Sequence, residues 1–133
     1  MSFHSLNHGL TTAMKGVEIE AFRVGDMNSS PCTVDDQAKS NLVSAVTISS
    51  GVVTVQFTKP YPPALVACLT QYGSASATDD IITARPREAG YDATDGTLTI
   101  DLSNDDDSGA PAAASPGADD ELHVLCVFRR YTT

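Results

Sequence analysis

The sequence predicts an all-β protein: a small β-sandwich, jelly roll or barrel of about seven strands with an extended N-terminal arm. Two segments alternate apolar and polar residues with the two-residue period of a half-buried strand. Turn-forming pairs that contain glycine fall between the apolar runs, and no segment carries a strong helical period. Because the chain has 133 residues, we expect one domain with one core.

The first strands are expected before the middle of the chain. Residues 17–22 (VEIEAF) and 42–48 (LVSAVTI) are rich in β-branched and aliphatic residues. In the next segment Val53, Val55 and Phe57 alternate with polar residues, which predicts a strand with one buried face. Between the first two strands, the segment TVDDQAKSNLV (33–43) is the best helical candidate, because Thr33 suits a helix cap and Asp35 and Asp36 favour a helix N-terminus.

Four more strands are expected in the second half. Residues 64–72 and 122–129 contain continuous apolar runs, which are typical of central strands covered on both faces. Residues 80–86 are rich in aliphatic residues, and residues 97–102 alternate regularly. The connector DATDGT, just before the strand at residues 97–102, has the composition of a hairpin turn.

The segment KPYPPA interrupts the pattern between two strands. Pro60, Pro62 and Pro63 donate no hydrogen bonds to a sheet, so we expect a rigid extended crossing. Tyr61 lies between these prolines. Its ring either covers the end of the core or serves as a docking contact on a preformed segment.

Two segments are unlike a compact core, so we divide the chain into an N-terminal arm, residues 1–16, and a single sandwich domain, residues 17–133. The arm has scattered apolar side chains and is expected either to fray or to grip a partner; these side chains are Phe3, Leu6, Leu10 and Met14. Within the domain, residues 103–120 form a long acidic loop of small and polar residues.

Motifs for metal sites are not found. The carboxylates of the acidic loop suit calcium, but their spacing differs from that of a calcium-binding loop. His4 and His8 are four residues apart without the glutamate of a zinc-binding H-E-x-x-H motif. Cys32, Cys68 and Cys126 are widely spaced, and we expect free thiols. We therefore predict no cofactor and no metal.

Motifs for catalysis and for binding to polyanions are not found either. The sequence has no nucleophile elbow and no phosphate-binding glycine loop, and His123 is expected on a sheet surface, so we expect no enzyme. Eight Lys and Arg residues against seventeen Asp and Glu give a net charge of −9, which argues against nucleic acid or an anionic membrane as partner. The few arginines are candidates for pairing with carboxylates across an interface: Arg85, Arg87, Arg129 and Arg130.

Four stretches, VVTVQFTKPYPPALVACL, DGTLTIDL, SGAPAA and DDELHVLCVFRR, resemble the pattern of small virion proteins that decorate the heads of tailed bacteriophages. The resemblance covers roughly residues 42–130 and rests on strands and turns. It implies a β-rich, non-enzymatic cement or decoration protein. Such a protein binds the outer surface of an expanded capsid and staples neighbouring capsomers.

The resemblance also implies the partners and the location of the protein. The partners are the major capsid protein and further copies of the chain, as a homotrimer in preference to a homodimer. The N-terminus lacks the pattern of a signal peptide, so we expect synthesis in the host cytoplasm before assembly into the virion. The alternative function is a tail or fibre adhesin whose sandwich binds glycans, although a chain without Trp and with four Tyr has few aromatic platforms for sugars.

Overall fold

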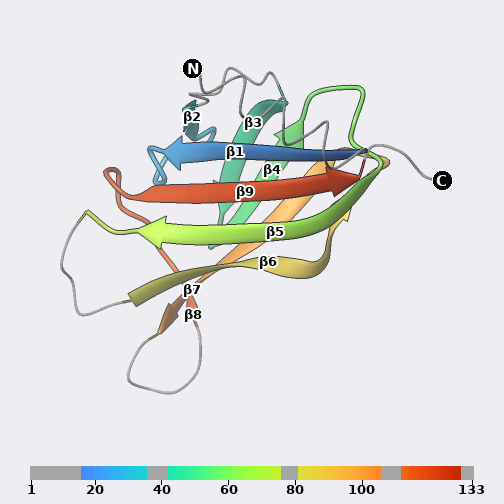
Figure 1. Cartoon of the computed structure of the whole chain (residues 1–133). Helices are drawn as coiled ribbons and strands as arrows, with labels where there is room; N and C mark the ends of the chain where they lie inside the picture. Colours follow the sequence, from blue (N-terminus) through green and yellow to red (C-terminus); the bar gives the residue numbers. More distant parts are fainter. Residues whose placement is uncertain (1–15, 36–41, 76–80, 106–111, 130–133) are drawn as a thin grey trace, which may run out of the picture.

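A computed structural model describes residues 16–35, 42–75, 81–105 and 112–129, and in them the chain forms nine β-strands (Figure 1). The bounds of the strands are β1 Val17–Gly25, β2 Thr33–Asp35, β3 Val43–Ser49, β4 Val52–Phe57, β5 Ala64–Gly73, β6 Ile81–Asp92, β7 Thr97–Asp105, β8 Ala112–Ala113 and β9 Glu121–Arg129. No helix occurs in these residues, so the described part contains no helix that could cross a membrane. The predicted all-β class is confirmed.

Two antiparallel sheets pack face to face and make the fold a β-sandwich. Sheet A has the strand order β2-β1-β9-β5, and sheet B has the order β3-β4-β7-β6, with the short β8 paired to β7. Sheet A is the nearer layer in Figure 1, and its strands cross those of sheet B at an angle. The first and last strands of the chain pair along eight residues, from Val17 opposite Arg129 to Val24 opposite Leu122.

The core lies between the sheets and is built from the alternate residues of each strand. In sheet B, Val53 and Val55 of β4 face Ile100 and Leu98 of β7, and all four are at most 1% exposed. Aromatic rings join the two layers. Phe57 meets Phe128 edge to face at 5.3 Å between ring centres, and Tyr91 lies beside both rings. The residues that carry the period-two pattern therefore form the core.

All seven expected strands are present, and the structure adds two short ones. The helix expected in residues 33–43 is wrong for the first three of them. Thr33–Asp35 forms the strand β2, which extends sheet A by pairing with Arg23–Gly25. Residues 36–41 of that segment lie outside the described residues. β6 continues beyond the expected end to Asp92, after an irregularity between Pro86 and Tyr91.

The prediction that β5 lies in the middle of its sheet is wrong. The apolar run that begins at Ala64 was expected to form a central strand, as was the run in β9. β9 does lie between β1 and β5, but β5 is the last strand of sheet A. Its outward side chains Val66 and Leu69 remain 55% and 68% exposed. Among the described residues, no second layer covers this side of β5 and accounts for its apolar composition.

The segment expected as an acidic loop, residues 103–120, has strand structure at its start. β7 continues to Asp105, and β8 returns beside it with Ala113 opposite Ser103. Toward the end of the segment Ala114 and Asp120 are buried. Residues 106–111 lie outside the described residues, as does the arm up to residue 15.

Candidate interaction surface

The outer face of sheet A carries rows of apolar side chains. Residues opposite one another in an antiparallel pair point to the same side of the sheet, so the register assigns every residue to a face. One outward row joins Ile19, Val127 and Ala67 across β1, β9 and β5. The next row joins Ala21, Leu125 and Leu69 in the same way. We call these six residues, with Val17 and Val66, the apolar face.

In β1 the residues that point outward are apolar and the residues that point inward are partly charged. Its register places Phe22 and Val24 in the core, so the alternate positions Val17, Ile19 and Ala21 point outward. The same register turns Glu18 and Glu20 toward the inner side of the sheet, where Glu20 lies opposite the buried Cys126. The usual arrangement of apolar residues inside and charges outside is thus reversed in the first half of β1. Departures from this arrangement are expected where a surface serves a function.

The outer face of sheet B has a different composition. Its central row consists of Thr47, Thr54 and Thr99. In a neighbouring row Arg85 lies opposite Asp101, and Thr83 bonds to Ser103 at 2.8 Å. A hydroxyl-rich face of this kind is stable in water, whereas contiguous exposed apolar side chains mark surfaces for binding. The outer face of sheet B is therefore richer in hydroxyl groups than that of sheet A, with Ile81 at the start of β6, 66% exposed, as an apolar exception.

Charged residues border the apolar face at both ends of the strands. Arg23 lies 3.3 Å from Glu121, which also lies 3.3 Å from the imidazole of His123. Arg129 is exposed at the other end of β9. Among the described residues this border has two arginines and one carboxylate, whereas the whole chain has eight basic and seventeen acidic residues. The apolar face is thus more cationic at its edge than the chain is on average.

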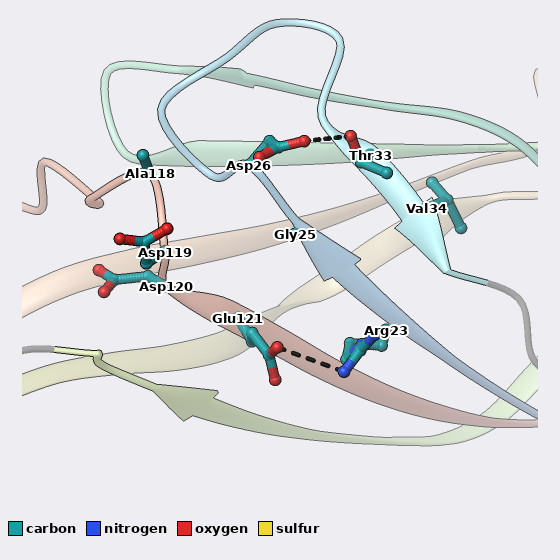
Figure 2. Close-up of a pocket in the computed structure, with 9 residues that line it drawn as sticks. All are labelled: Arg23, Gly25, Asp26, Thr33, Val34, Ala118, Asp119, Asp120 and Glu121. Carbon is teal, nitrogen blue, oxygen red and sulfur yellow. Dashed lines mark hydrogen bonds and ion pairs between the residues drawn. The ribbon is translucent and has the colours of Figure 1, made fainter.

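A pocket of about 450 Å³ lies near one end of sheet A, where β1, β2 and the turn before β9 meet (Figure 2). Nine residues line it: Arg23, Gly25, Asp26, Thr33, Val34, Ala118, Asp119, Asp120 and Glu121. Figure 2 shows that two of its polar groups already have partners, because Asp26 bonds to Thr33 and Glu121 pairs with Arg23. No aromatic ring is among the nine, so the pocket lacks the stacking platform that glycans favour.

Asp120 of this pocket has a structural role. Its carboxylate accepts hydrogen bonds from the Tyr72 hydroxyl at 2.6 Å and from the amides of Gly117 and Ala75 at 2.9 and 3.0 Å. Burial alone would raise the pKa of Asp120, but these hydrogen bonds outweigh it and lower the pKa below its ordinary value. Asp120 therefore ties the turn before β9 to the end of β5. In the described ranges no group of three or more His, Cys, Asp or Glu is placed to hold a metal ion.

The structure separates the residues predicted as interface. Tyr61 is half-buried against the core, and its ring lies so close to Gly96 that a Cβ there would be 2.1 Å from it. This position favours the interpretation that Tyr61 covers the end of the core. Arg129 lies beside the apolar face, whereas Arg85 and Arg87 are on sheet B, with Arg87 bonded to Asp101 at 2.6 and 3.0 Å. The remaining predicted residues lie outside the described part of the chain: Phe3, Leu6, Leu10, Met14 and Arg130.

The apolar face itself was not predicted from the sequence. Its residues come from three strands that are far apart in the chain, and only the register brings them into common rows. A signal was present, however, because β5 and β9 are apolar at odd and at even positions. A strand that is apolar on both sides needs cover on both sides. His123 is on the sheet surface as expected, exposed and pointing outward.

Comparison with known proteins finds no match: no family model, no curated protein and no solved structure is similar to this chain.

Proposed function

We propose that the protein is a non-enzymatic structural protein that binds another protein through the apolar face of sheet A. The observation that carries this proposal is the contrast between the two outer faces: adjoining rows on sheet A are aliphatic, whereas the central row on sheet B consists of threonines. Leaving Leu69 68% exposed has no benefit for the isolated chain. The same side chain gains roughly 1.5–3 kcal/mol when a partner removes it from water.

The charges favour a partner other than a second copy at this face. Two copies would each bring a net charge of −9, and their mutual repulsion opposes stacking of one apolar face on another. The exposed Arg129 at the border instead matches a surface with an apolar centre and an acidic edge. Self-association, expected as a trimer in preference to a dimer, then uses other surfaces of the molecule. Light scattering of the purified chain measures that state.

The resemblance to phage decoration proteins supports the identity of the partner, which we propose to be a major capsid protein on the outside of a tailed-phage head. Two strands of nine residues and one of ten cover only about 14 by 30 Å. Such an area is below that of a standard stable protein interface, about 800 Å² per partner. Contacts of this size bind more tightly when several are linked in one oligomer, as in the expected trimer, because the later contacts form at a high effective concentration.

Cryo-electron microscopy of the virions that carry this gene tests the proposed function. We expect one density for this chain at each of a set of symmetry-related positions on the outer surface of the head. Mass spectrometry of purified virions should detect the chain in many copies per particle. Finding the chain only in the tail, or only in the lysate of infected cells, contradicts the proposal.

A further inference from the structure

Two cysteines face each other inside sheet A, beneath the apolar face. Cys68 of β5 and Cys126 of β9 are direct partners in the strand register. Both are thiols, and the Cys126 sulfur donates a hydrogen bond to the Cys68 sulfur across 4.0 Å. The third cysteine, Cys32, is not part of this pair, and its thiol bonds to the Ser29 carbonyl. The sulfur atoms of Cys68 and Cys126 are thus in contact without a covalent bond.

The strand register meets the requirements of a disulfide. Residues directly opposite in an antiparallel pair have Cα atoms about 4.5–5.5 Å apart. Disulfides join Cα atoms that are about 4.4–6.8 Å apart, so the backbone already has the required separation. The sulfur atoms must move from 4.0 Å apart to the length of a bond, about 2.05 Å, which the two side chains can approach by rotation.

The two thiols differ in the way that stepwise oxidation requires. Cys68 is half-buried on the last strand of the sheet, whereas Cys126 is fully buried on a central strand. The hydrogen bond from Cys126 lowers the pKa of Cys68, and the same bond together with burial raises the pKa of Cys126. Cys68 is therefore the accessible thiol and the one that more readily becomes the nucleophilic thiolate.

We propose that Cys68 and Cys126 form a site of reversible oxidation that closes to a cross-strand disulfide. With hydrogen peroxide as oxidant, the Cys68 thiolate attacks one oxygen, the O–O bond breaks, and the hydroxide that leaves takes a proton to become water. The Cys126 sulfur then attacks the resulting sulfenic acid. The S–O bond breaks as the disulfide forms, and a second water leaves with the Cys126 proton. Two thiols and one peroxide thus give one disulfide and two waters. A dithiol reductant restores the two thiols by exchange and is itself oxidised to a disulfide.

The disulfide would fasten the last strand of sheet A to its neighbour. β5 pairs on one side with β9, and toward sheet B it makes a hydrogen bond from the Thr70 hydroxyl to the Ala84 carbonyl at 2.7 Å. A bond between Cys68 and Cys126 restricts the unfolded chain by closing a long loop, so it stabilises the folded state. The thiol form suits a reducing cytoplasm, and the disulfide suits an oxidising exterior. The chemistry does not depend on which partner the apolar face binds.

Peptide mapping of the purified full chain tests this inference. After treatment with hydrogen peroxide, mass spectrometry without reductant should find one peptide pair, linked through Cys68 and Cys126, and dithiothreitol should release it. The melting temperature of the oxidised protein should rise by roughly 5–15 °C. The variant Cys32→Ser should keep both results, whereas Cys68→Ser should lose both and still melt cooperatively.

Three outcomes would overturn the inference. The first is oxidation that links Cys32 or joins two chains instead. The second is oxidation that ends at a sulfinic acid on Cys68 with no linked peptide. The third is a linked peptide that leaves the melting temperature unchanged, which would show that the bond does not fasten the sheet.

Discussion

Gly96 and Tyr61 illustrate how single residues close one end of the core. Gly96 ends the turn between β6 and β7 with a φ of +70°, which favours glycine. A Cβ at this position would lie 2.1 Å from the Tyr61 ring, and the Gly96 carbonyl accepts a hydrogen bond from the Phe57 amide. The Tyr61 ring, on the proline-rich crossing before β5, thus packs closely against the turn before β7.

We expect Gly96→Ala to destabilise the fold by about 2–4 kcal/mol, because it adds backbone strain and a steric clash. Urea unfolding of the two proteins measures the difference. Gly25→Ala is the matched control, since a Cβ there meets nothing within 4 Å, and it should change stability by less than about 0.5 kcal/mol. In a protein that already carries Tyr61→Ala, adding Gly96→Ala should lower the stability clearly less than it does in the wild type. Equal costs in both backgrounds would show that the ring contact is unimportant.

Asp120 gives the fold a dependence on pH. Its pKa is lowered in the folded state, so its contribution to stability is complete above the ordinary pKa of about 3.9 and is lost as the pH falls through the lowered value. Asp120→Asn should cost about 1–3 kcal/mol at pH 7, because hydrogen bonds to a charged acceptor are lost.

Melting temperatures between pH 7 and pH 3 test the role of Asp120. The difference between the wild type and Asp120→Asn should shrink as the medium becomes acidic. The neighbouring exposed carboxylate provides a control, and Asp119→Asn should follow the wild type throughout. A difference that stays constant with pH would mean that the Asp120 charge does not stabilise the fold.

At the scale of elements, the apolar face predicts that an aspartate introduced on the outside of sheet A weakens binding to the partner. The same substitution on the outside of sheet B should not weaken it. Leu69 and Thr47 are both exposed and lie on the last strands of their sheets. Leu69→Asp should weaken binding to capsids by about tenfold or more, since it places a charge within an apolar contact. Thr47→Asp should bind as the wild type does, because it lies on the hydroxyl-rich outer face of sheet B.

Co-sedimentation of each variant with capsids that lack the protein measures the binding. Both variants should melt within a few degrees of the wild type, since neither position belongs to the core. Equal loss of binding in the two variants, or loss only in Thr47→Asp, would contradict the assignment of the apolar face.

The elements also show what the sequence predicts well. Alternation identified β4 and β7, because one face of each is buried and the other is polar. β2 was not identified, since three residues carry no period and Thr33 resembles a helix cap. β5 was identified as a strand but placed in the interior, because an apolar outer face looks the same in sequence whether a layer of the same chain or a partner covers it.

At the scale of the whole molecule, all-β class and sandwich architecture followed from the number of short strands and the turns between them. The candidate site did not follow in the same way. The predicted interface residues were chosen singly by type, and they are scattered over both sheets, as Arg85 and Arg129 show. The rows of the apolar face depend on the pairing of Ile19 with Val127 and of Val127 with Ala67. Such long-range register is set by the packed core and not by any local pattern.

The orientation of the protein on its partner tests the central claim most directly. A cryo-electron microscopy map of decorated heads, at a resolution that separates strands, shows which face of the sandwich is in contact with the capsid. We predict that β1, β9 and β5 lie against the capsid, with Leu69 and Leu125 in the contact and Thr47 facing solvent. A map in which the hydroxyl-rich face of sheet B makes the contact, with the apolar face open to solvent, would contradict this account.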